Sequence, residues 1–173
     1  MRALVVLIVD RDATSLIRIT RLVDVAMARL GRVASVVRHR EWAENYGTEA
    51  DAAHERWVRQ VRDRLQAGGD VIVATLRPWE CFVAGNACKA SFRHLMVVCE
   101  ESLGYELGVR FMLEVERWLG VPLQRRIVLT TSLDARGYDH VHAAHRIPKH
   151  LPDEELITAL CRILRKTLRV RRT

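Results

Sequence analysis

The 173-residue sequence lacks the features that identify several common protein classes. No apolar run approaches the roughly 20 residues that a membrane-spanning helix needs, so we expect no membrane insertion. The four cysteines show no C-x-x-C spacing. No internal repeat, low-complexity tract, helix-turn-helix, zinc finger or RNA-binding signature is visible. These absences indicate an ordinary globular protein, and they do not assign it to any of these classes.

Cysteine usage favours a reducing compartment. Cys99 lies in an apolar strand-like run and Cys161 on the apolar face of a predicted helix, so we expect both to be buried as small hydrophobic residues. The sequence leaves open whether Cys81 and Cys88 form a disulfide. Charged residues interrupt the amino-terminal apolar stretch and no small-residue cleavage site follows it. We therefore expect mature structure rather than a signal peptide, and a cytoplasmic location.

Lysine is scarce although the chain is basic. The formal net charge is +7 and the sequence isoelectric point is about 9.8, yet Lys89, Lys149 and Lys166 are the only lysines among 28 basic residues. The excess of positive charge predicts an anionic partner. Basic residues crowd the last dozen positions with no acid among them. They are Arg162, Arg165, Lys166, Arg169, Arg171 and Arg172.

Apolar runs alternate with helical periodicities along the chain. Val- and Ile-rich runs predict buried strands at residues 3–9, 33–37, 70–76, 95–99 and 127–131. Apolar positions at helical spacing predict helices at residues 16–30, 49–67, 104–119 and about 153–170. We expect loops or irregular structure at residues 41–48 and 133–151, and either a short helix or a loop at residues 79–92.

This alternation predicts a single α/β domain over residues 1–173. The expected fold is three-layered and Rossmann-like or flavodoxin-like, with about five mostly parallel strands between helices. Ligands bind such folds at the carboxyl ends of the strands. Polar residues that follow the apolar runs should meet at that edge: Asp10, Asp12, Thr75, Arg77, Glu100, Glu101 and Thr131.

Asp10 and Asp12 come directly after the first apolar run. Two carboxylates in this position can chelate Mg²⁺, and one can attack a phosphoryl group while the other transfers a proton. Asp12 or Thr14 can equally cap the helix that follows, because both side chains accept hydrogen bonds from free backbone amides. The sequence leaves both interpretations open.

The apolar run followed by Asp10-x-Asp12-x-Thr14 resembles the first motif of the haloacid dehalogenase-like phosphohydrolases. The resemblance implies that Asp10 is the nucleophile and Asp12 the general acid/base. It places the family's phosphate-binding hydroxyl at Thr75 and its lysine at Lys89. It also implies bound Mg²⁺, with Glu100, Glu101 and Glu106 standing where the family usually has metal-binding aspartates. The expected metal ligands are Asp10, Asp12 and Glu101.

Residues 102–108 carry a second pattern, Ser-Leu-Gly-Tyr-Glu-Leu-Gly. It is similar to the S-x-G-x-x-E-L-G pattern of nucleoside deoxyribosyltransferases and TIR-like nucleotide hydrolases, one residue shorter in its middle. The resemblance implies that Glu106 acts on an N-glycosidic bond. Alternatively, Glu106 pairs with Arg110 four residues later on a solvated helix face.

Histidines cluster in the stretch after the last predicted strand. If residues 140–142 are extended, His140 and His142 point the same way, as metal chelation requires. The same side chains can line the site and contact an anionic ligand, or form polar surface. We include His142 among the expected ligand-binding residues.

Together these patterns favour binding of a nucleotide or phosphorylated small molecule. The enzymatic form of this prediction is a Mg²⁺-dependent phosphoryl or glycosyl hydrolase using Asp10, Asp12 and Glu106. The expected ligand-binding residues are Thr14, Thr75, Arg77, Lys89, Glu100, Thr131 and His142. Two alternatives are a nucleic-acid-binding module that uses the basic carboxyl-terminal helix, and a non-catalytic scaffold. We also expect that the chain can form a homo-oligomer.

Overall fold

The computed structural model describes residues 4–38, 48–76, 94–100, 110, 114, 117, 125–130 and 144–169. The strands are β1 (Leu4–Val9), β2 (Ala34–Arg38), β3 (Asp70–Thr75), β4 (His94–Glu100), β5 (Arg125–Thr130) and β6 (Ala144–Pro148). The helices with described bounds are α1 (Ala13–Arg29), α2 (Thr48–Gln66) and α5 (Asp153–Arg169). Residues 110, 114 and 117 are also helical, and the rest of the helix predicted at 104–119 lies outside the described residues.

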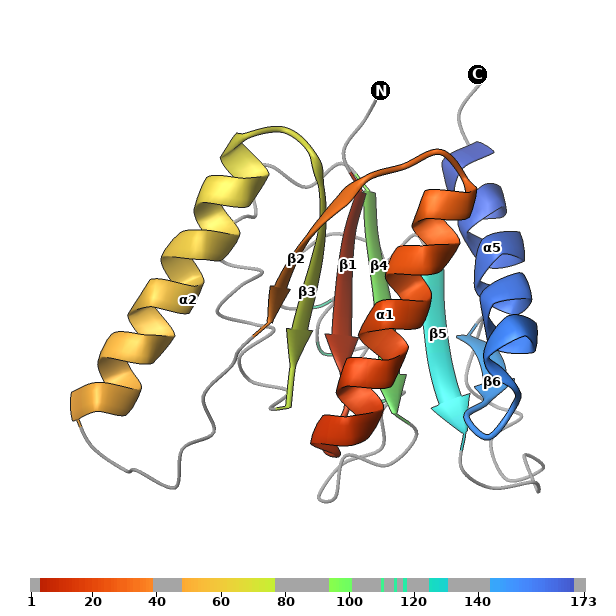
Figure 1. Cartoon of the computed structure of the whole chain (residues 1–173), viewed down its shortest axis with the longest axis horizontal. Helices are drawn as coiled ribbons and strands as arrows, with labels where there is room; N and C mark the ends of the chain where they lie inside the picture. Colours follow the sequence, from red (N-terminus) through yellow and green to blue (C-terminus); the bar gives the residue numbers. More distant parts are fainter. Residues whose placement is uncertain are drawn as a thin grey trace.

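Within these ranges the six strands form one sheet in the order β2-β3-β1-β4-β5-β6 (Figure 1). Every neighbouring pair of strands runs parallel. The predicted α/β class with a parallel sheet is therefore confirmed. The strand order itself differs from both 3-2-1-4-5-6 of the classical dinucleotide-binding fold and 2-1-3-4-5 of flavodoxin.

One detail of the prediction is wrong: residues 144–148 form a strand, β6, where we expected irregular structure. With β6 the described sheet has six strands, close to the expected number of about five. β6 has the sequence Ala-His-Arg-Ile-Pro and contributes Ile147 to the core. It lacks an apolar run because it lies at an edge of the sheet, where a proline is also tolerated.

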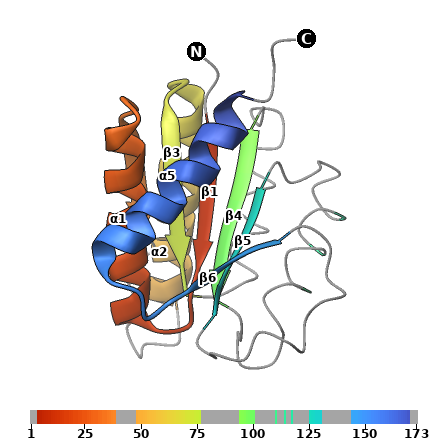
Figure 2. The ribbon, with the colours of Figure 1, turned by 90° about the vertical axis from the view of Figure 1, so that its right-hand side faces the viewer.

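Helices α1 and α5 lie side by side on one face of the sheet (Figure 2). The apolar stripe of α1, including Leu22 and Val23, joins the buried α5 residues and alternate residues of β1 such as Val6 and Ile8 in one core cluster. The other residues of β1 are buried as well. Because successive side chains of a strand point to opposite faces, both faces of the sheet must be covered.

Helix α2 packs against β2 and β3. The chain moves from β1 across β3 to β2 and then returns to β3, so right-handed connections place α1 and α2 on opposite faces. As predicted, Trp57, Val61 and Leu65 of α2 are buried and its arginines are exposed. No helix in the described part of the chain is both long enough and apolar enough to cross a membrane.

The strand order locates a crevice between β1 and β4. The chain leaves β1 toward β2 on one side and leaves β4 toward β5 on the other. Ligands of open α/β sheets bind where the connections diverge in this way, beyond the carboxyl ends of the strands. Residues at the ends of β1 and β4 are therefore the first candidates for a site.

At the amino ends of the strands, opposite this crevice, Arg32 and Asp70 form a buried ion pair. Both side chains are only 6% exposed, and Arg32 Nη2 lies 2.5 Å from Asp70 Oδ1. The same oxygen accepts a hydrogen bond from the backbone N–H of Leu4 at 2.8 Å. Asp70 thus joins the starts of β1 and β3 to the residues that follow α1.

We expect Asp70→Ala to lower the free energy of unfolding by about 3–5 kcal/mol, because it leaves a buried guanidinium without its counter-charge. Arg21→Ala serves as the control, since Arg21 pairs with Asp153 while 65% exposed. That loss should be at most about 1 kcal/mol. Urea denaturation measures both values, and equal losses would contradict a structural role for the Arg32–Asp70 pair.

Candidate active site

Residues 10–12 form the whole connection between β1 and α1. Asp10 is fully buried, whereas Arg11 and Asp12 are exposed. The backbone N–H of Asp10 donates to the carbonyl oxygen of Thr75 at 3.3 Å, so β1 and β3 remain joined just beyond their last paired residues. Thr75 is also buried. The structure thus brings Asp10 and Thr75 together, as predicted.

Asp12 caps α1. Its Oδ1 accepts a hydrogen bond from the backbone N–H of Ser15 at 2.6 Å. This confirms the capping interpretation for Asp12 and not for Thr14, which is exposed in the first turn of the helix. One carboxylate oxygen of Asp12 is therefore committed to the helix terminus.

Asp10 has three donors around its carboxylate. Oδ1 accepts from the backbone N–H of Asp12 at 2.9 Å, and Oδ2 accepts from Ser15 Oγ at 2.6 Å. The ammonium of Lys149 lies 2.7 Å from Oδ2. A buried carboxylate needs such partners, because burial without them is strongly unfavourable.

Glu100, the last residue of β4, contacts the same lysine. It is 4% exposed, and its Oε1 lies 3.2 Å from Lys149 Nζ. Its Oε2 accepts from the backbone N–H of Arg11 at 3.4 Å and lies 3.6 Å from Arg11 Nε. The ends of β1 and β4 therefore hold two buried carboxylates on either side of one ammonium. We call Asp10, Glu100 and Lys149 the carboxylate–lysine cluster.

Lys149 is the member of this cluster that the sequence analysis did not include among the candidate site residues. It follows β6 directly, and its side chain is 14% exposed. Arg18 of α1 fixes the surrounding backbone by donating to the carbonyl oxygens of Lys149 and Leu151, each at 2.8 Å. The scarcity of lysine in this chain was the one sequence signal that could have drawn attention to Lys149.

Burial raises the pKa of Glu100 above its ordinary value, and the neighbouring charge of Asp10 raises it further. The ammonium of Lys149 opposes both effects, and so does the backbone hydrogen bond from Arg11. The net direction of the pKa is upward because burial and the charge of Asp10 together outweigh the effects of Lys149 and Arg11. Perturbed carboxyl groups of this kind cluster at functional sites.

Several expected site residues lie outside the described residues, so their roles stay predictions. They are Arg77, Lys89, Glu101, Glu106, Thr131, His140 and His142. On the carboxyl-terminal helix, Arg162, Arg165 and Lys166 are exposed as expected. Arg169 ends α5 without a described side chain, and Arg171 and Arg172 lie outside the described residues. Cys99 and Cys161 are free and buried, as predicted, whereas Cys81 and Cys88 are not described.

The described residues do not by themselves fit Mg²⁺. Across these ranges no group of three or more His, Cys, Asp or Glu side chains could hold a metal ion. Asp10 and Glu100 already share the positive charge of Lys149. Mg²⁺ prefers six oxygen ligands in near-octahedral geometry. The predicted magnesium site also includes Glu101, which is not described, and it stays a prediction.

No protein-family model and no curated protein matches the sequence. Among solved structures, the chain is similar to a de novo designed PLOOP2X3_50 fold protein solved by NMR, with a TM-score of 0.51 and 13% identity over 97% of this chain and 95% of that chain. It is also similar to a de novo designed protein of the P-loop NTPase fold, with a TM-score of 0.46 and 8% identity over 98% of each chain. The similarity to the PLOOP2X3_50 protein shows a common fold and nothing about function.

The β1–α1 connection differs from a phosphate-binding P-loop. That motif is the glycine-rich stretch G-x-x-x-x-G-K-[ST], whose backbone N–H groups surround phosphate. Here the connection has three residues and no glycine. The backbone N–H groups of Arg11, Asp12 and Ser15 already donate to carboxylates of this chain. These three N–H groups are therefore not available to an anion at the start of α1.

The raised pKa of Glu100 predicts a specific dependence of stability on pH. Between about 4.5, the ordinary value, and the raised value, the folded state keeps a proton that the unfolded state has lost. Stability contributed by Glu100 is therefore complete below pH 4.5 and is lost as pH rises through the raised pKa. Glu100→Gln removes this titration. We therefore compare the free energy of unfolding of the wild type with that of Glu100→Gln. The wild-type value minus the variant value should fall as pH rises from about 4.5 through the raised pKa.

Thermal and urea unfolding at several pH values measure this difference. Glu55→Gln is the matched control, because Glu55 is exposed on α2. The difference in free energy of unfolding between the wild type and Glu55→Gln should change much less with pH. A constant difference for Glu100→Gln would show that Glu100 has no raised pKa in the folded protein.

Proposed function

We propose that the carboxyl edge of the sheet binds a nucleotide or a phosphorylated small molecule at the carboxylate–lysine cluster. The observation that carries this proposal is a lysine held between two buried carboxylates where the strand connections diverge. Bringing three charged groups out of water costs several kcal/mol per ion before their mutual attraction is counted. Such an arrangement is better explained by a binding site than by a contribution to stability.

The chemistry of the cluster suits a ligand that carries both phosphate and hydroxyl groups. The exposed guanidinium of Arg11 and the ammonium of Lys149 provide two cations for phosphate oxygens. The buried carboxylates accept hydrogen bonds from donors such as ribose hydroxyls. The β1–α1 backbone contributes little, because its N–H groups are engaged.

A narrower form of the proposal is phosphoryl hydrolysis. Asp10 would attack phosphorus to form an aspartyl phosphate, and the leaving oxygen would take a proton from Asp12. Water would then cleave the aspartyl phosphate and release inorganic phosphate. Lys149 would neutralise the developing charge in place of the expected Lys89. The resemblance noted above and the contact of Lys149 with Asp10 support this form. Glycosyl hydrolysis by Glu106 and Mg²⁺ binding remain further proposals.

Ligand binding can be tested with a thermal-shift panel of nucleotides and sugar phosphates, with and without Mg²⁺. A ligand at 100 times its Kd stabilises the folded state by about 2.7 kcal/mol. We expect at least one phosphorylated ligand to raise the Tm of the wild type, and Lys149→Met to lose that increase. Arg59→Met, an exposed position on α2, is the charge-matched control and should retain it.

Circular dichroism should first establish that Lys149→Met is folded. Binding is disproved if no member of the panel shifts the wild type, or if folded Lys149→Met responds as the wild type does. If Mg²⁺ takes part, the shift of the wild type should be larger with Mg²⁺ than without it.

Hydrolysis needs a separate assay. Asp10→Asn removes the nucleophile but keeps a side chain of similar size, so phosphate release should fall at least about 100-fold. Asp24→Asn, a half-buried position on α1, should release phosphate at the wild-type rate. If a ligand binds but the wild type releases no phosphate, the narrower form fails and the binding proposal stands.

A further inference from the structure

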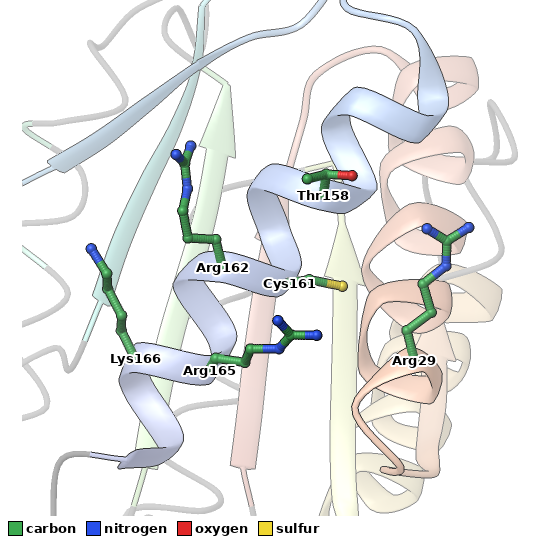
Figure 3. A pocket seen from close by; sticks show the side chains of 6 residues that line it. All are labelled: Arg29, Thr158, Cys161, Arg162, Arg165 and Lys166. Carbon is green, nitrogen blue, oxygen red and sulfur yellow. The ribbon is translucent and has the colours of Figure 1, made fainter.

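A hollow of about 440 Å³ lies between α1 and α5 (Figure 3). It shares no lining residue with the carboxylate–lysine cluster. Arg29 is the last residue of α1, which places it about 24 Å along the helix axis from the end that bears Asp12. The lining residues are Arg29, Thr158, Cys161, Arg162, Arg165 and Lys166. We call this hollow the α1–α5 pocket.

Four of the six side chains that line the pocket are cationic. On α5, Arg165 and Lys166 lie three and four residues after Arg162, and all three side chains line the pocket. Among the described residues, Arg162, Arg165 and Lys166 have no ion-pair partner, whereas Arg29 pairs with Glu154 at 2.9 Å. The pocket therefore gathers positive charge that this part of the chain does not neutralise.

Compensation of the helix dipole explains only part of this charge. The dipole acts on groups in the last turn of a helix, where cations are favourable. Arg29 meets that condition in α1. Arg162 lies seven residues before the end of α5, about 10 Å along its axis. The charge around the pocket extends beyond what the two helix ends require.

We propose that the α1–α5 pocket binds a compact oligophosphate. Its volume lies within the range of small-molecule sites, about 300–1,000 Å³. Arginine is well suited to phosphate, because its planar group donates two parallel hydrogen bonds. No aromatic side chain lines the pocket, so it offers no surface on which bases could stack. This favours linked phosphate groups over a nucleic-acid strand as the occupant.

The two uncharged side chains that line the pocket already have hydrogen-bond partners. Cys161 is 8% exposed, and its thiol donates to the carbonyl oxygen of Ala26 at 3.5 Å. Thr158 Oγ1 donates to the carbonyl oxygen of Glu154 at 2.8 Å. Both groups are thus engaged with helix backbone. The cationic side chains are left as the donors that contact the ligand.

Isothermal titration with inorganic triphosphate tests this proposal. We expect the wild type to bind it, and Arg162→Gln/Arg165→Gln to bind roughly tenfold more weakly or worse, which corresponds to about 1.4 kcal/mol. The control, Arg56→Gln/Arg59→Gln, removes the same charge from exposed positions on α2. It should stay within about twofold of the wild type once the ionic strength is about 0.15 M.

Three results would overturn the proposal. They are no binding of triphosphate by the wild type, equal weakening in both double variants, and binding to a single-stranded oligonucleotide that strengthens with its length and exceeds that of triphosphate. The last result would instead support the nucleic-acid alternative. The titration changes Arg162 and Arg165 and the thermal-shift panel changes Lys149, so failure here is distinguishable from failure at the carboxyl edge.

Discussion

The contact of Lys149 with Asp10 and Glu100 is the constraint on which the carboxyl edge depends. Without the ammonium, two carboxylates would face each other away from water, and one would have to take up a proton. With it, the end of β1, the end of β4 and the segment after β6 are held together. Arg18 supports the arrangement from α1 by holding the backbone around Lys149. These contacts therefore fix both the positions of the charged groups and the backbone around Lys149.

The two edges of the sheet use buried charge in different ways. At the amino edge, Arg32 and Asp70 match one positive charge with one negative charge, and neither side chain is accessible. At the carboxyl edge, one lysine serves two carboxylates, and Arg11 adds an exposed cation at the margin. The balanced pair suits a permanent structural contact. In the carboxyl-edge cluster two carboxylates share one ammonium, so Lys149 alone neutralises each carboxylate only in part.

The parts of the fold that depend on burial were predictable from the sequence. Continuous apolar runs identified β1 and β3 because both faces of these strands are covered, and Trp57 on the apolar stripe of α2 is buried as expected. The meeting of Asp10, Thr75 and Glu100 followed from parallel strands alone. β6 could not be found in this way, because an edge strand buries too few residues to need an apolar run. Lys149 was missed with it, since its place depends on β6 completing the sheet.

The short β1–α1 connection changes how this fold can handle an anion. A glycine-rich loop leaves backbone N–H groups open to phosphate, and their direction is fixed by the helix terminus. In this chain Asp10, Asp12 and Glu100 accept from those groups instead. The positive end of the α1 dipole is thus used within the protein. In the proposed function, recognition of phosphate would rest on long side chains, which lose conformational freedom when they bind. Arg18 reduces that loss for Lys149 by fixing the backbone from which its side chain extends.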